Sequence, residues 1–106
     1  MASHLMEMKA AVLKALAHPT RLAVVEALGG QGEKCVCELF DVVAPGDRTT
    51  LSKHLAILKA AGLVTDRKEG LKVFYALRCP CLIPFLGCIE QTVRQRVDEE
   101  RKALRT

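Results

Sequence analysis

Aromatic side chains are scarce in this 106-residue sequence, which has no tryptophan, one tyrosine and three phenylalanines. The apolar half of the composition therefore consists mainly of leucine, valine, isoleucine and alanine, the usual material of helix packing. A chain of this length is too short to build two separate cores. We expect one mainly α-helical domain over residues 1–106, with no structural role for residues 1–5, which are either native or a cloning remnant.

Long apolar runs are also absent. Lys, Arg or Glu interrupts each apolar stretch well before the ~20 residues that a membrane span needs, and no apolar run with a small-residue cleavage site opens the chain. These absences predict a cytoplasmic protein with no membrane partner. The five cysteines are odd in number, which argues against a disulfide framework in a reducing compartment and leaves free thiols or metal ligands.

Basic residues are concentrated in one third of the chain. Residues 48–78 contain seven basic and two acidic side chains, whereas the rest contains nine basic and ten acidic ones. A local excess of this kind suits contact with phosphate groups, although a solvated lysine-rich surface is the alternative interpretation.

Apolar residues at helical spacing predict four helices in the first part of the chain, over 8–17, 19–28, 36–43 and 48–61. The turn at 44–46, which contains Pro45 and Gly46, joins the third helix to the fourth, as in a minimal helix-turn-helix. Asp47 suits the N-cap of the fourth helix, and Gly62 suits a left-handed residue after its end.

Two short β-rich runs, 63–67 and 71–77, follow the fourth helix and flank the polar segment 68–70, which ends in glycine. This pattern predicts a β-hairpin. A hairpin that directly follows a helix-turn-helix is a wing. The predicted fold class is therefore mainly α with a small β-hairpin wing, a winged helix-turn-helix.

The C-terminal segment 82–104 has apolar residues at steps of three and four, namely Leu82, Leu86, Ile89, Val93 and Val97, with Gln, Arg and Glu on the opposite face. Such a stripe packs either on the chain's own core or on a second subunit. We favour the second subunit, which predicts a homodimer formed through the terminal helices.

Three motifs occur in order: LAHPTRL at 16–22, LSKHLAILKAAGLV at 51–64 and RKEGLKVFY at 67–75. Together they resemble the ArsR/SmtB family of metalloregulatory repressors, and the resemblance spans residues 8 to about 90. It implies a winged-helix homodimer that binds double-stranded operator DNA, with the fourth helix in the major groove.

The N-terminal residues of a recognition helix reach the base edges. The candidates for base reading are therefore Arg48, Thr49, Thr50, Ser52 and Lys53. His54 is expected to pack or to touch a phosphate rather than to read a base. On the wing, phosphate or minor-groove contacts are expected from Arg67, Lys68 and Lys72.

The segment from Cys35 to Leu39 is similar to the metal-binding box of the arsenic-sensing members of the family. Those relatives have a third cysteine three residues after the second, where this sequence has Phe40. Two residues that are two positions apart on a helix point about 200° apart. Cys35 and Cys37 can therefore share an ion only if the first turn opens or if Cys35 precedes the helix, and binding is expected to distort the third helix.

Cys79, Cys81 and Cys88 form a second group, where the last strand passes into the final helix. Pro84 suits the first position of that helix, which would leave Cys79 and Cys81 in a loop. Three arrangements stay open: the first pair takes a third ligand from this group, this group binds alone, or both bind. The alternative is that some of these cysteines are small buried apolar residues.

An all-sulfur site favours As(III) or Sb(III) as the inducer, followed by Cd(II) or Pb(II). No organic cofactor is expected, and the final helix lacks the histidine of the zinc-sensing relatives. The predicted function is a metalloid-responsive repressor that leaves its operator when the ion binds. A thiol redox or persulfide sensor of the same fold is the alternative. A protein-binding winged-helix module is a further alternative, whereas an enzyme is not expected, because no Cys-x-x-Cys motif is present.

Overall fold

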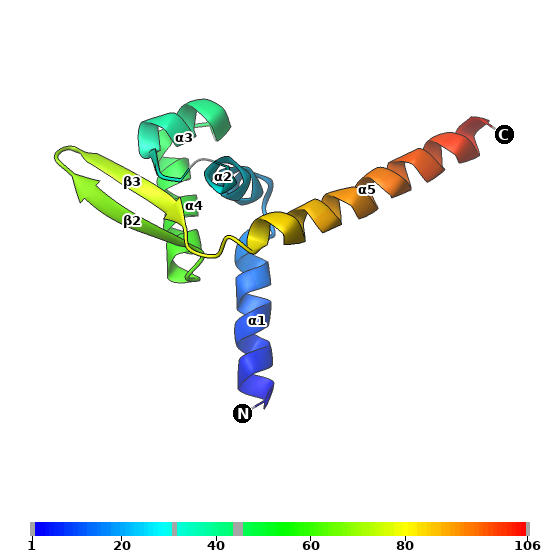
Figure 1. Ribbon diagram of the computed structural model, residues 1–106, viewed down its shortest axis with the longest axis horizontal. Coiled ribbons are helices and arrows are strands. Elements are labelled where there is room, and N and C mark those ends of the chain that lie inside the picture. The colour runs from blue at the N-terminus through cyan, green and yellow to red at the C-terminus, as the bar shows by residue number, and fades with distance from the viewer. Residues whose placement is uncertain (1, 31, 44–45, 106) are drawn as a thin grey trace.

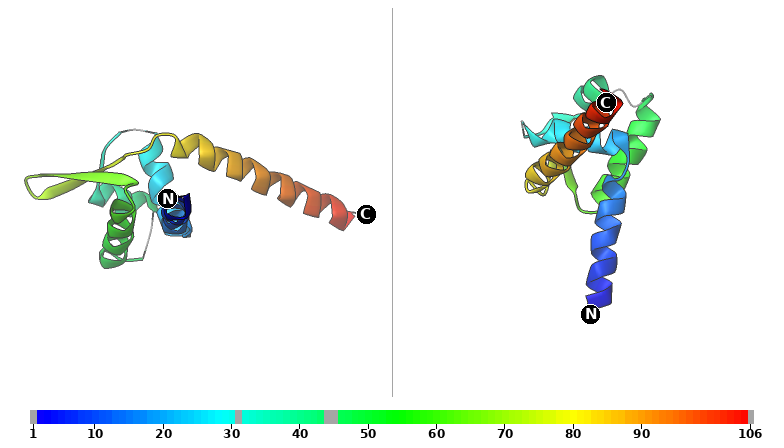
Figure 2. Two further views of the ribbon diagram at one scale, coloured as in Figure 1. Left: turned by 90° about the horizontal axis from the view of Figure 1, so that it is seen from below. Right: turned by 90° about the vertical axis from the view of Figure 1, so that its right-hand side faces the viewer.

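The computed structural model describes residues 2–30, 32–43 and 46–105 (Figure 1). The elements follow in the order α1 (Ala2–Leu16), α2 (Pro19–Gly29), β1 (Lys34–Cys35), α3 (Val36–Val43), α4 (Arg48–Ala60), β2 (Val64–Glu69), β3 (Lys72–Leu77) and α5 (Leu82–Arg105). Helices α2, α3 and α4 pack beside the hairpin, and α1 and α5 project away from this body in different directions (Figures 1 and 2). The predicted winged helix-turn-helix fold is confirmed.

The core is aliphatic and lies where the helix-turn-helix meets the base of the hairpin. Its most buried side chains come from four elements, namely Val24, Val25, Leu28, Leu39, Leu51, Leu55, Leu58 and Val64. Burying each leucine contributes about 1.5–3 kcal/mol. Because α4 gives three leucines to this core, its opposite face is left free to contact a ligand.

Both ends of α4 have the predicted caps. The Asp47 carboxylate accepts a hydrogen bond from the Thr50 N–H at 2.7 Å, which lowers the pKa of Asp47. Gly62 adopts φ 79°, and the N–H of Leu63 donates to the Leu58 carbonyl at 3.0 Å. Gly46 of the preceding turn has φ 104°, whereas Ala44 and Pro45 lie outside the described residues.

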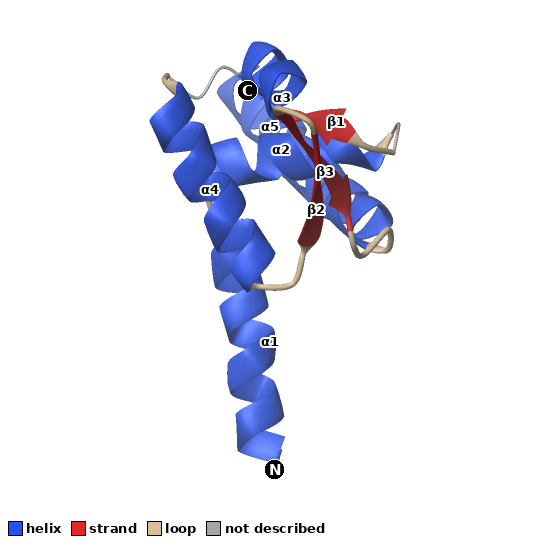
Figure 3. Ribbon diagram, turned by 90° about the vertical axis from the view of Figure 1, so that its left-hand side faces the viewer, coloured by secondary structure: helices blue, strands red, loops and turns tan. Residues whose placement is uncertain are grey.

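The hairpin is part of a three-stranded antiparallel sheet with the order β1-β3-β2 (Figure 3). The two-residue strand β1 was not predicted from the sequence. It pairs Cys35 with Phe74 of β3, and Phe74 also pairs with Arg67 of β2. The segment that carries Cys35 is therefore an edge strand of the wing.

Helix α1 begins earlier than predicted, whereas α5 begins at residue 82, the predicted start of the C-terminal dimerisation segment. Helix α1 starts at Ala2 rather than at residue 8, and its first apolar side chains, Leu5 and Met6, are exposed, so no buried face signalled this extension. Helix α5 starts at Leu82, so the placement of Pro84 at its first position was wrong. A proline fits near a helix start because the first N–H groups have no intrahelical partner. No helix of the described residues is long and apolar enough to cross a membrane.

Candidate DNA-binding and sensing site

Helix α4 presents polar side chains on the face opposite its core leucines. Arg48, Thr49, Ser52 and Lys53 are exposed, and Thr50 is half-buried. The backbone N–H of Thr50 is bonded to Asp47, which fixes the first turn. The residues predicted to read bases therefore lie at a rigid, accessible helix start.

His54 faces the interior of the domain rather than this exposed surface. Its ring lies 4.4 Å from the ring of His18, centroid to centroid, and its buried Nδ1 has no hydrogen-bond partner among the described residues. The Nδ1 of His18 accepts a hydrogen bond from the Thr20 N–H at 3.0 Å and so caps α2. His54 thus packs α4 against the start of α2, in line with the packing role expected from the sequence.

We expect acid to weaken the fold through His54. Burial, followed by the nearby His18 and Arg21, lowers the pKa of His54 from its ordinary value of 6.5. As the pH falls through 6.5, the unfolded chain takes up a proton before the folded chain does, so the free energy of unfolding decreases. Urea unfolding of the wild type should show this loss between about pH 7.5 and about pH 5.5.

The variant His54→Gln should show a smaller loss over the same interval, because it lacks the titrating ring. His4→Gln, on the exposed surface of α1, is the matched control and should behave as the wild type. The carboxylates with lowered pKa, Glu33, Glu38 and Asp47, have ordinary values of 4.5 or 3.8 and act below this interval. Equal pH dependence in the His54→Gln variant and the wild type would contradict the assignment.

On the wing, Arg67 is held by two carboxylates. Its Nε donates to the Glu33 carboxylate at 2.8–2.9 Å, its Nη1 donates to Glu69 at 2.9 Å, and its guanidinium lies 4.8 Å from the centre of the Phe74 ring. These bonds raise the pKa of Arg67 and lower that of Glu33. Arg67 therefore ties the segment before β1 to β2, while the other two predicted wing residues, Lys68 and Lys72, are exposed.

Cys35 lies just before α3 and caps it. Its Sγ accepts a hydrogen bond from the Glu38 N–H at 3.4 Å, and a Glu38 carboxylate oxygen accepts one from the Cys35 N–H at 3.1 Å. This is the reciprocal pattern of a capping box, with a sulfur in the place of the usual hydroxyl. The spacing of Cys35 and Glu38 is the sequence signal from which this cap could have been predicted.

The sulfurs of Cys35 and Cys37 meet because Cys35 precedes the helix. The interaction between the two thiols lowers the pKa of Cys37 and raises that of Cys35. Lys72 lowers the pKa of Cys37 further. Of the two geometries that permit a shared ion, the structure has the one with Cys35 outside the helix.

The cysteine pair opens onto a pocket of about 250 Å³ that also contacts both candidate DNA-binding elements. Arg48 comes from the start of α4, and Leu71 and Lys72 come from the tip of the wing. Phe40, at the position of the third cysteine of arsenic-sensing relatives, holds its ring 5.4 Å from the guanidinium carbon of Arg48. A ligand on the two sulfurs would therefore lie against the recognition helix and the wing together.

Comparison with known proteins identifies the family. A helix-turn-helix domain model matches residues 16–67, from the end of α1 into β2. An HTH-type transcriptional regulator of Methanocaldococcus jannaschii is 44% identical over 69 residues, which are 65% of this chain and 76% of that protein. The arsenical resistance operon repressor of Escherichia coli is 42% identical over 66 residues, 62% of this chain and 56% of that one.

The solution structure of a homodimeric winged helix-turn-helix DNA-binding domain from Mycobacterium bovis covers 92% of this chain and 89% of its own, with a TM-score of 0.77 and 28% identity. The chain belongs to the ArsR/SmtB family. Its relatives are DNA-binding transcriptional regulators rather than enzymes. The chain spans about half the length of the E. coli repressor, so what that protein responds to does not carry over directly.

For an ArsR/SmtB protein with a two-cysteine box, the later cysteines are the obvious source of a third ligand. Cys79 is half-buried against the core, and Cys81 and Cys88 are exposed. Phe74 pairs with Cys35, and β3 continues for three residues beyond Phe74, about 10 Å, before the chain turns toward Cys79. No group of three metal-binding side chains forms within the described ranges. One chain therefore supplies two neighbouring sulfurs, and the participation of the late group stays a prediction.

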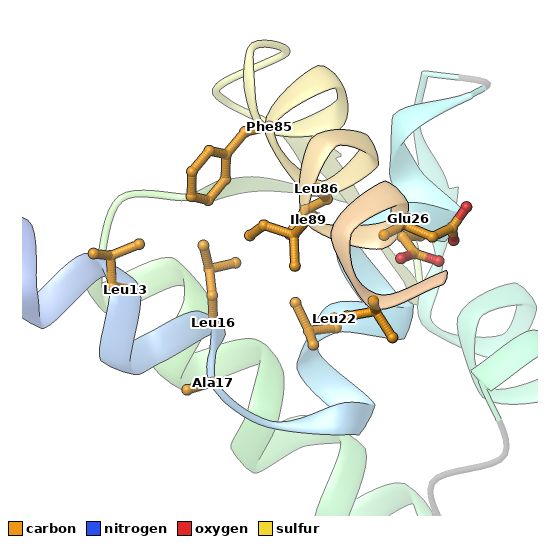
Figure 4. Close-up of a pocket in the computed structure, with 10 residues that line it drawn as sticks. Leu13, Leu16, Ala17, Leu22, Glu26, Phe85, Leu86 and Ile89 are labelled. Atoms are coloured by element: carbon orange, nitrogen blue, oxygen red, sulfur yellow. The ribbon is translucent and has the colours of Figure 1, made fainter. Parts of the chain in front are cut away.

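The stripe on α5 is only partly used within the chain. Leu82 is buried and Leu86 half-buried, whereas Ile89, Val93 and Val97 are 41–54% exposed. Figure 4 shows Phe85, Leu86 and Ile89 of α5 facing α1 and α2 across an apolar groove of about 380 Å³. Beyond its first turns, the stripe of this ArsR/SmtB protein does not pack on its own core.

Proposed function

We propose that this protein is an operator-binding repressor that leaves DNA when a thiophilic ion, As(III) or Sb(III) in the first place, binds Cys35 and Cys37. The observation that carries the proposal is the pocket that the two cysteines share with Arg48 and Lys72. An ion bound there lies where the recognition helix and the wing approach each other. The occupied sensor and the bound operator then favour different arrangements of the same residues.

The residues present fit a two-sulfur site. Thiolates are the soft ligands that trivalent arsenic and antimony prefer. Cys35 is 4% exposed and Cys37 is half-buried, so the pair is partly screened from solvent. A third coordination position falls to a ligand from outside this part of the chain: hydroxide, a small thiol, or one of Cys79, Cys81 and Cys88, including those of a second subunit.

Release of DNA follows from the role of Cys35 as the N-cap of α3. When its sulfur turns toward an ion, the hydrogen bond from the Glu38 N–H is lost, and the first turn of α3 must rearrange. Phe40 lies in α3, and the guanidinium of Arg48 packs on its ring. A rearrangement of α3 therefore displaces the start of α4. The pairing of β1 with β3 carries the displacement into the wing.

The DNA-binding half of the proposal predicts a strong salt dependence. Lys53, Lys68, Lys72 and Arg48 are exposed cations on α4 and the wing, and each phosphate that they neutralise releases counterions. Because a dimer presents about eight such cations, its affinity for a duplex selected from a random-sequence library should fall by about 10³- to 10⁵-fold between about 50 and about 200 mM salt. An affinity that stays flat over this range would exclude phosphate contacts by these residues.

The sensing half is tested by titrating the selected duplex, bound to the protein, with arsenite, antimonite, cadmium and zinc in separate experiments. We expect release at the lowest concentrations with arsenite and antimonite, and no release with zinc at the same concentrations. Protection of two thiols from alkylation should accompany release. If none of the ions releases the duplex, the metalloid proposal is wrong even if DNA binding stands.

A redox sensor is the second candidate, favoured by the lowered pKa of Cys37 and by the pocket that Cys37 shares with Cys35. A peroxide would convert the Cys37 thiolate to a sulfenic acid with loss of hydroxide. Attack by the Cys35 thiol would then give a disulfide and water. Release by hydrogen peroxide, reversed by a dithiol reductant and unaccompanied by release with arsenite, would favour this reading over the first.

A further inference from the structure

The tip of the wing carries an apolar side chain that is fully exposed to solvent. Strand β2 ends at Glu69, β3 begins at Lys72, and these two residues pair, so the turn consists of Gly70 and Leu71. Leu71 is 101% exposed, more than any other large apolar residue of the described part. Leu13, Phe85, Ile89 and Val93, which are also exposed, instead line the groove between the terminal helices.

The hairpin itself has no need of a leucine at this position. Gly70 adopts the positive φ, 62°, that a tight two-residue turn requires. The other turn position favours short polar residues such as Asn, Asp, Ser or Gly, which bond to the local backbone or to water. Leu71 buries no area and makes no such bond, so its presence departs from local turn chemistry without a gain for the fold.

The surroundings of Leu71 indicate what it meets. It follows the exposed cation Lys68 and directly precedes the exposed cation Lys72. It also lines the pocket that Arg48, at the start of the recognition helix, lines from the other side. An apolar tip between two exposed lysines, on a narrow hairpin beside the helix proposed to enter the major groove, suits the neighbouring minor groove.

We propose that Leu71 is a DNA-contacting residue that inserts as a wedge into the minor groove beside each major-groove site, while Lys68 and Lys72 hold the flanking phosphates. This inference rests on the DNA binding of the proposed function. Apolar wedges part base steps, and pyrimidine–purine steps part most readily. The protein therefore prefers a TA or CA step under the wing, at a position where no side chain reads a base by hydrogen bonding.

The test uses the full chain and a duplex selected from the random library, with 2-aminopurine next to the step under the wing. Leu71→Asn places a favoured turn residue at the tip, so the melting temperature should stay equal or rise. Its affinity should fall about fivefold to tenfold, the equivalent of exposing most of one leucine side chain. The rise in 2-aminopurine fluorescence seen with the wild type should disappear, and the slope of affinity against salt should not change.

Val42→Ala is the matched control, because Val42 is 65% exposed at the end of α3 and lies outside the terminal helices. It should bind and unstack the duplex as the wild type does. Lys53→Ala, in the recognition helix, should lose affinity whether or not the wedge exists. If Leu71→Asn keeps wild-type affinity and fluorescence while Lys53→Ala loses binding, the wedge is refuted and the proposed function stands. An equal loss in Val42→Ala also refutes the wedge, and failure of the wild type to bind any duplex refutes both.

Discussion

Replacing Cys37 with serine should raise the arsenite concentration needed for operator release by about 100-fold or more, because the variant loses one of the two sulfurs that hold the ion. The affinity for the selected duplex without ion should stay within about twofold, because Cys37 caps nothing and lies outside the core. Fluorescence anisotropy of a labelled duplex, titrated with arsenite, measures both quantities.

Cys35 allows a sharper version of this experiment, because its sulfur also caps α3. Serine is among the best N-cap residues, so Cys35→Ser should keep the helix start while losing the ion response. Cys35→Ala should lose both, and its melting temperature should lie below that of Cys35→Ser. Equal melting temperatures for the two variants would show that the sulfur cap does not contribute to folding.

Cys88→Ser tests whether the late group takes part, since Cys88 is exposed on α5 and does not line the pocket of Cys35 and Cys37. If those two sulfurs hold the ion without Cys88, this variant should respond to arsenite as the wild type does. If Cys88→Ser loses the response and Cys37→Ser keeps it, the sensing site lies in the late cysteine group instead. Loss in both variants would indicate a site that needs ligands from both groups.

Replacing Val93 with aspartate should convert the protein from a dimer to a monomer and weaken operator binding by about 100-fold or more. Val93 is 54% exposed in the middle of the α5 stripe, beside the groove between α1 and α5. A charge placed there has no partner in an apolar interface and cannot keep its water. A monomer binds one half-site at a time and loses the gain that comes from linking two.

Sedimentation equilibrium gives the mass, and titration of the selected duplex gives the affinity. Gln95→Asp introduces the same charge on the polar side of α5 and should leave the dimer intact. The circular dichroism of Val93→Asp should remain that of a folded helical protein, because the Val93 side chain is about half exposed within the single chain. A dimer that persists in this variant would mean that the stripe is not the subunit interface.

The recognition helix and the wing could be predicted because their signals are local. Asp47 and Gly62 mark the ends of α4 within a few residues of the apolar pattern, and a single glycine marks the turn of the hairpin. The structure keeps these elements, but it extends β2 to Glu69 and moves the turn of the hairpin from the predicted residues 68–70 to Gly70 and Leu71. Most of the surface proposed to bind DNA is formed by residues that are neighbours in sequence, and it could therefore be predicted.

The connections between these elements could not be predicted in the same way. Strand β1 has two residues, too few for a periodic pattern, and exists only through its pairing with β3. The bond between Glu33 and Arg67 joins residues 34 positions apart, so neither residue signals the other. Both contacts depend on how the chain closes on itself. The start of α1 was missed for the opposite reason, because its apolar residues face away from the core.

The capping box at the start of α3 has a consequence for how sensitive such a detector is. Opening the first helical turn of α3 costs free energy, and this cost reduces the net free energy with which the ion binds its two sulfurs. Glu38 contributes to that work without being a ligand. Its replacement therefore offers a way to lower or raise the concentration threshold of the response while the chemistry that selects the ion stays the same.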